Sequence, residues 1–115
     1  MKATFELKRT ADGQFMFNLR APNNQTILTS QCYASKEAAK EGIASIRENA
    51  GLDERYEEKK GADGSPYFLL HSANRLVIGN SEMYSSPQAM HKGMASVKKN
   101  GPVAEIVDLS LQMHA

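Results

Sequence analysis

The sequence repeats itself at an interval of 51 residues, and this duplication constrains the fold more than any other feature. Residues 5–57 align with residues 56–108 without a gap, and 18 of the 53 aligned pairs are identical. Two copies are too few for an elongated solenoid, in which each repeat contacts only its neighbours. We therefore expect the copies to close on each other about a pseudo-twofold axis and to share one core.

Each copy opens with a pattern typical of a β-hairpin. Asp12-Gly13 and Asp63-Gly64 separate stretches in which apolar and polar residues alternate. Asp-Gly favours a tight turn with positive φ at both central positions. Further turns at 23–24 and 74–75 lead into third strands. The alternation predicts a buried set of strand residues on one face: Phe5, Leu7, Phe15, Phe17, Leu19, Tyr56, Phe68 and Leu70.

A helix of roughly four turns is predicted after the strands of each copy. Ser35 and Ser86 are placed as N-caps, and Asn-containing stop signals follow. A glycine lies in the middle of each apolar stripe, at Gly42 and Gly93, and suggests a close approach of the helix backbone to the sheet. A last strand-like piece follows each helix, and the first of these also opens the second copy. The stripes are Ala38, Ala39, Gly42, Ile43 and Ile46, and Ala89, Met90, Gly93, Met94 and Val97.

Composition narrows the class of protein. The 115 residues carry 14 Lys and Arg against 13 Asp and Glu, with no polybasic arm in either half, which disfavours nonspecific nucleic-acid binding. No apolar run approaches a membrane span or a signal core, so a cytoplasmic location is expected by default. Cys32 is the one cysteine, and we expect it to be a small buried hydrophobe rather than half of a disulfide.

The repeated pattern "ADGQFMFNLRAPNNQTILTSQCYASKEAAKEGIASIRENA" and "ADGSPYFLLHSANRLVIGNSEMYSSPQAMHKGMASVKKNG" resembles the YegP-like family of small bacterial proteins over roughly residues 2–110. The resemblance implies an α+β fold of two β3-α-β repeats that share a single, mainly antiparallel sheet and exchange their C-terminal strands. It implies no activity and no catalytic residues. The second copy departs from the pattern at Pro66 and at Arg75-Leu76.

From these patterns we expect one compact domain over residues 1–110, with both helices on one face of the sheet. Repeat one covers about 2–55, repeat two about 53–110, and residues 111–115 form a flexible tail. One chain supplies both halves of what would otherwise be a dimer, so a monomer is expected.

The sheet face opposite the helices is the predicted binding surface. Strand alternation places several large side chains there, and a contiguous exposed apolar patch usually marks an interaction site. The expected occupant is a protein partner or a second copy of the chain. The predicted patch consists of Met16, Arg20, Leu28, Tyr67, Leu69, His71 and Val77.

Single-stranded nucleic-acid binding on the same face is the alternative. Tyr67 offers a stacking platform, and Arg20, Lys8 and Lys59 offer phosphate contacts. It ranks second because only one aromatic residue points the right way and because acidic residues lie nearby.

The sequence favours a protein without catalytic residues, cofactor or metal. No His, Cys or carboxylate cluster has metal-ligand spacing, and neither a phosphate loop nor a nucleophile elbow is present. A Cys32 nucleophile would need His71 or His91 as its base, and its counterpart in the second copy is Met83. The repeated polar residues, such as Ser30 and Ser81, are explained by turns and caps.

Overall fold

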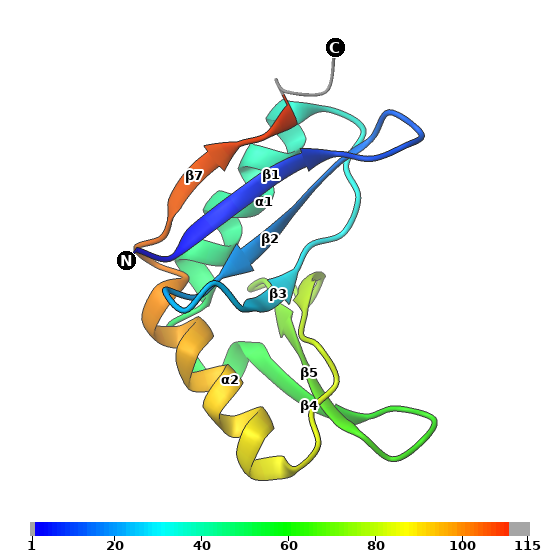
Figure 1. The fold of residues 1–115 in the computed structure, drawn as a ribbon, viewed down its shortest axis with the longest axis vertical. Coiled ribbons are helices and arrows are strands. Elements are labelled where there is room, and N and C mark those ends of the chain that lie inside the picture. The colour runs from blue at the N-terminus through cyan, green and yellow to red at the C-terminus, as the bar shows by residue number, and fades with distance from the viewer. Residues whose placement is uncertain (1, 111–115) are drawn as a thin grey trace.

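The computed structural model describes residues 2–110, in which seven strands and two helices follow the duplicated order predicted from the sequence (Figure 1). The first copy forms β1 (Thr4–Arg9), β2 (Phe15–Arg20), β3 (Thr26–Thr29) and α1 (Lys36–Asn49). A 3-10 turn, η1 (Asp53–Arg55), leads into the second copy. That copy forms β4 (Tyr56–Lys60), β5 (Pro66–His71), β6 (Val77–Asn80), α2 (Pro87–Asn100) and β7 (Glu105–Asp108). The expected tail lies outside the described residues.

The strands form one seven-stranded sheet in the order β4-β5-β6-β3-β2-β1-β7. All neighbouring pairs are antiparallel except β1 and β7, which run parallel. The last strand of the second repeat thus lies beside the first strand of the first, as Figure 1 shows. Its counterpart in the first repeat is the segment that becomes η1 and the start of β4. The two halves of the sheet meet through a single residue pair, Thr29 with Asn80.

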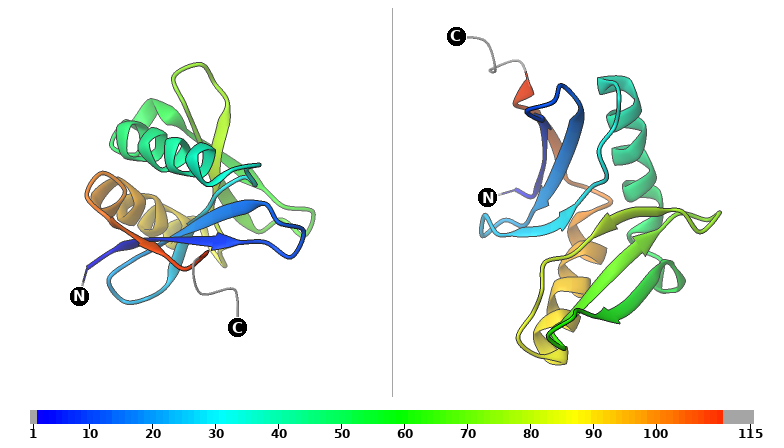
Figure 2. Two further views of the ribbon diagram at one scale, coloured as in Figure 1. Left: turned by 90° about the horizontal axis from the view of Figure 1, so that it is seen from above. Right: turned by 90° about the vertical axis from the view of Figure 1, so that its right-hand side faces the viewer.

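Both helices cover the same face of the sheet (Figure 2). Helix α1 contacts β2 of its own repeat and β5 and β6 of the other, and α2 contacts β5 and β3. The Oγ atoms of Ser35 and Ser86 accept hydrogen bonds from the third residue of each helix, at 3.0 and 3.1 Å, as N-caps do. Each helix therefore packs on strands from both repeats, and the fold is an α+β sheet with intertwined halves.

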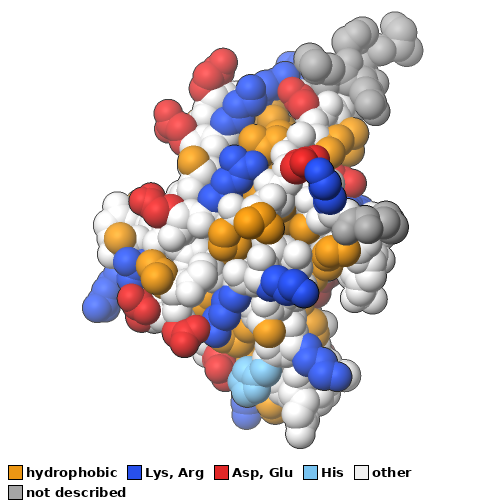
Figure 3. All heavy atoms as spheres, turned by 90° about the vertical axis from the view of Figure 1, so that its left-hand side faces the viewer, with side chains coloured by type: hydrophobic (Ala, Val, Ile, Leu, Met, Phe, Trp, Pro, Cys, Tyr) orange, Lys and Arg blue, Asp and Glu red, His pale blue; other side chains and the backbone are white. Residues whose placement is uncertain are grey.

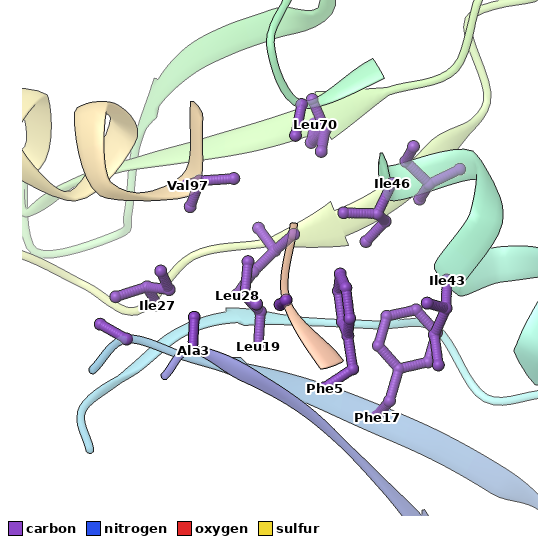
Figure 4. Close-up of a cluster of buried hydrophobic side chains, with 14 of the residues drawn as sticks. Ala3, Phe5, Phe17, Leu19, Ile27, Leu28, Ile43, Ile46, Leu70 and Val97 are labelled. Atoms are coloured by element: carbon purple, nitrogen blue, oxygen red, sulfur yellow. The ribbon is translucent and has the colours of Figure 1, made fainter. Parts of the chain in front are cut away.

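The predicted apolar stripes meet in a shared core (Figure 4). The fully buried large side chains come from both helices and from the inner face of both halves of the sheet. They are Phe5, Leu7, Phe17, Leu19, Leu28, Ile43, Ile46, Phe68, Leu70, Met90 and Val97. Phe15 and Tyr56 are half-buried at the margin of this core.

The hairpin turns differ from the sequence prediction. Only the glycine of each Asp-Gly pair has positive φ, at 86° for Gly13 and 85° for Gly64. All four hairpins use the same three-residue loop, in which the third residue takes the left-handed conformation and donates to the carbonyl three residues earlier. In the other two loops that residue is Asn24 or Arg75, each with φ of 68°. The Asp-Gly pairs do mark the hairpins, but in a longer loop than expected.

The mid-helix glycines lie under tyrosine rings. A Cβ placed on Gly42 would lie 2.7 Å from Cζ of Tyr33, and one on Gly93 would lie 2.6 Å from Cζ of Tyr84. Each ring also stacks on a core phenylalanine of its repeat. The closest approach to the helix backbone is therefore made by the tyrosine of the strand-to-helix loop. In the first repeat the sheet residue Phe17 comes next, with its Cε2 3.2 Å from a Cβ placed on Gly42.

Two further predictions are wrong. Strand alternation predicts Leu28 on the open side of the sheet, but this residue is 1% exposed and its neighbour across the sheet is Leu19 of the inner face. A register shift between Leu19 and Arg20 adds one residue to β3 and reverses the face on which Leu28 lies. Cys32, expected to be buried, is exposed in the loop before α1.

Candidate functional site

Six of the seven residues of the predicted patch lie on the sheet face that points away from the helices. The five on β2 and β5 each lie next to a buried residue of the same strand, and the sixth, Val77, pairs with His71 across the sheet. All six are half-buried, so each side chain keeps contact with solvent. They are Met16 and Arg20 on β2, Tyr67, Leu69 and His71 on β5, and Val77 on β6. We call this surface the open face, and Leu28 does not belong to it.

In the first repeat the open face is covered by a polar network. Glu6 accepts from Arg20 Nε at 2.7 Å, and Lys8 Nζ lies 3.9 Å from the same carboxylate. Lys8 also donates to Oδ1 of Asn18 at 2.9 Å, and the amide of Asn18 donates to Thr29 at 3.0 Å. These polar groups contact one another across β1, β2 and β3. They are therefore less available to bind a partner.

The second repeat keeps the ion pairs but not the central amide. Glu57 lies 2.9 Å from Nε2 of His71 and 3.7 Å from Nζ of Lys59. The hydrogen bond from His71, with the nearby charge of Lys59, lowers the pKa of the Glu57 carboxyl. Where the first repeat has Asn18, the second has Leu69, while Tyr67 replaces Met16 and Val77 replaces Thr26. Tyr67, Leu69 and Val77, which we call the apolar trio, make this half of the open face the more apolar one.

A groove of about 720 Å³ lies between α2 and the β2–β3 turn. Its ionisable side chains are Glu82, Tyr84 and Lys92. Burial, followed by the charge of Glu82, raises the pKa of the Tyr84 phenol above its ordinary value. Sequence reasoning missed this groove, because its walls come from segments far apart in the chain. Of its ionisable residues, only Tyr84 is repeated in the other copy.

Charge on the side of the molecule where α2 and β7 lie is mixed. Figure 3 shows Lys and Arg side chains interspersed with Asp and Glu, without a continuous field of one sign. Ion pairs also join separate elements, as Lys98 does with Asp53 at 2.6 Å and Lys36 with Asp108 at 2.9 Å. Within residues 2–110, no group of three His, Cys, Asp or Glu side chains is arranged to hold a metal ion. Neither described helix is long and apolar enough to cross a membrane.

The duplicated polar residues have structural roles. Ser30 Oγ accepts from the backbone N–H of Phe17 at 2.9 Å, and Ser81 does the same for Phe68. The amides of Asn49 and Asn100 donate to carbonyls one turn earlier in their helices. These bonds satisfy groups that would otherwise be buried without a partner. The repeated serines and asparagines are thus explained by the fold.

These features define a class: small α+β proteins in which two β3-α-β repeats share one sheet and one core. The sequence matches the domain of unknown function DUF1508 twice, over residues 11–57 and 62–108. The chain belongs to this family, the YegP-like UPF0339 proteins, as the resemblance of the repeats predicted.

Relatives and solved structures agree with this assignment. The chain is 47% identical over 108 residues to the UPF0339 protein YegP of Escherichia coli K12, covering 94% of this chain and 98% of the relative. It is 48% identical over 107 residues to the UPF0339 protein YegP of Yersinia pestis, covering 93% and 96%.

The solution NMR structure of UPF0339 protein SO3888 from Shewanella oneidensis matches with a TM-score of 0.91 at 40% identity, covering 99% of this chain and 97% of that one. The NMR structure of yegP from E. coli, described as a protein of unknown function, matches with a TM-score of 0.90 at 46% identity, covering 96% and 95%.

Proposed function

We propose that this protein is a non-enzymatic interaction module that binds a protein partner through the open face of its second repeat. The observation that carries the proposal is the apolar trio of Tyr67, Leu69 and Val77, which replaces Met16, Asn18 and Thr26 of the first repeat. Partly exposed apolar side chains with a charged rim are typical of protein-binding surfaces. Glu57, Lys59 and His71 supply that rim.

The electrostatics of the same face weigh against its alternative use, single-stranded nucleic-acid binding. The cations expected to contact phosphates, Arg20, Lys8 and Lys59, each lie within 3.9 Å of a carboxylate. Tyr67 beside Lys59 in the strand register is the one arrangement that favours stacking with a phosphate contact. Salt-sensitive retention of a labelled single-stranded oligonucleotide by the wild type, lost in Tyr67→Ser, would favour this alternative over a protein partner.

The duplicated chain provides its own control for the protein-binding proposal. The test variant Leu69→Asn/Val77→Thr gives the second repeat the first-repeat residues at two of the three positions of the apolar trio. The control variant is Met16→Ser on the first repeat. Immobilised wild type and control should retain the same binding protein from a bacterial lysate, identified by mass spectrometry and then tested purified, and the test variant should lose it. Equal binding by all three would refute the proposal, and a concentration-dependent increase in mass of the wild type would identify a second copy as the occupant.

A further inference from the structure

Two pairs of equivalent residues contact each other where the repeats meet. Leu28 and Gly79 are related by the interval of 51 residues, as are Ala50 and Gly101. A Cβ placed on Gly79 would lie 2.7 Å from Cδ2 and 2.8 Å from Cγ of Leu28. One placed on Gly101 would lie 2.7 Å from Cβ of Ala50. Equivalent residues that contact each other across a twofold interface lie next to its axis, so both pairs mark the pseudo-twofold axis of the molecule.

The larger residue belongs to the first repeat in both pairs. Leu28 is buried, pairs with Leu19 across the sheet, and belongs to the same core as Val97 and Leu70 of the second repeat (Figure 4). It fills the space that a side chain at position 79 would need. Ala50 is buried in the same way against Gly101. The first repeat thus supplies the projecting side chain at each axial position, and the second repeat supplies the space.

Backbone conformation does not explain the glycines. Positive φ among the described glycines occurs at Gly13 and Gly64, and not at Gly79 or Gly101. A side chain at position 79 is therefore opposed by Leu28 alone among the nearest atoms. A Cβ at Gly101 would also lie 2.9 Å from the carbonyl oxygen of Val97 in its own repeat. At position 79 the nearest opposing atoms thus come only from the other repeat, which makes the Leu28–Gly79 pair suitable for a test of the contact between repeats.

We infer that the two repeats are specialised as complementary halves, so that the inner surface of repeat one accepts a repeat two and rejects another repeat one. Two first repeats would bring Leu28 against Leu28 and Ala50 against Ala50, in space that holds one side chain at each position. Two second repeats would leave that space empty, which destabilises a core. The interface is therefore closed to like-with-like pairing between copies of the chain, and its fitting partner is the second repeat. This inference does not depend on the open face.

The test compares the full chain with Leu28→Gly, Gly79→Leu and the exchange variant Leu28→Gly/Gly79→Leu, by urea unfolding and light scattering. Each single variant should lose at least tenfold in the ratio of folded to unfolded protein, through a void or a clash. The exchange variant should recover most of that loss, because it moves the projecting side chain to the other half. It also keeps one leucine and one glycine in the strands, so differences in strand propensity largely cancel.

A double-mutant cycle with smaller substitutions tests the same contact if one of these single variants does not fold. Gly79→Ala introduces only the Cβ that meets Leu28, and Leu28→Ala removes the atoms that it meets. The double variant should be more stable than the sum of the two single losses predicts. Additive losses, or a Gly79→Leu protein as stable as the wild type, would overturn the inference. So would an exchange variant no more stable than Gly79→Leu.

Discussion

The tyrosine before each helix packs against the backbone of a glycine in the middle of that helix. Tyr84 lies so close to Gly93 that the helix has no room there for a methyl group. We expect Gly93→Ala to destabilise the protein by about 1–3 kcal/mol, the usual range for overpacking, despite the higher helix propensity of alanine. Thermal unfolding followed by circular dichroism measures this. Gly51→Ala is the control, because no atom lies within 4 Å of a Cβ there, and an equal loss in both variants would contradict the prediction.

The buried hydroxyl of Ser30 provides a second prediction at the residue scale. Its Oγ accepts from the backbone N–H of Phe17 inside the core. Ser30→Ala leaves that donor unpaired, and we expect a loss of about 1–3 kcal/mol in the free energy of unfolding from urea titration. Ser85→Ala, on an exposed serine, should change little. A neutral Ser30→Ala would mean that water reaches the Phe17 amide.

At the scale of elements, the four hairpin loops share one geometry but not one residue type. The left-handed position holds Gly13, Asn24, Gly64 and, less suitably, Arg75. An L-residue with a long side chain is strained in this conformation, whereas glycine is not. Arg75→Gly should therefore raise the free energy of unfolding, by up to about 1 kcal/mol. Asn74→Gly, one position earlier, should lower it, and urea titration that ranks the two variants the other way would refute this account.

Strand β7 ends at Asp108, whose carboxylate accepts hydrogen bonds from Lys36 and from Ser110. The Ser110 hydroxyl, and after it Lys36, hold the pKa of Asp108 below its usual range. A lowered folded-state pKa gives stability that is present above the unfolded value of about 3.9 and is lost as pH falls through the lower folded value. Protection of the Leu109 amide, which donates to Leu7 O at 2.8 Å, should decline below about pH 4.

Hydrogen exchange should also show weaker protection of Leu109 at neutral pH in Asp108→Asn, with less dependence on acid. Asp12→Asn is the control, because the Asp12 carboxyl also has a lowered pKa but lies in the β1–β2 loop. Unchanged protection in Asp108→Asn would show that the backbone pairing of β7 with β1 is sufficient.

The predictions that failed concern how elements pair with one another. Alternation and turn residues locate the hairpins, the helix stripes and six of the seven patch residues, because these are local patterns. The face of Leu28 is predicted wrongly because of the register shift between Leu19 and Arg20. This shift has no local signature in the sequence, and it places Leu28 on the opposite face of β3 from the one that simple alternation predicts. The axial pairs and the α2 groove were missed because they join residues that only the closed molecule brings together.

At the scale of the whole molecule, each helix contacts strands of both repeats. We therefore propose that residues 2–110 unfold as one cooperative unit. Phe17→Ala and Phe68→Ala should each cost about 3–5 kcal/mol and shift the same single transition, because both rings are buried in the shared core. Residue-resolved hydrogen exchange measures this, and a loss of protection confined to the mutated repeat would contradict it.

The place of β7 beside β1 has a consequence for biosynthesis. The outer edge of β1 stays uncovered until Glu105–Asp108 have been made and have left the exit tunnel. This edge lacks its neighbouring strand while all the other strands of the sheet are being made. Pairing of the sheet on the nascent chain is therefore completed only when β7 has emerged and has reached β1.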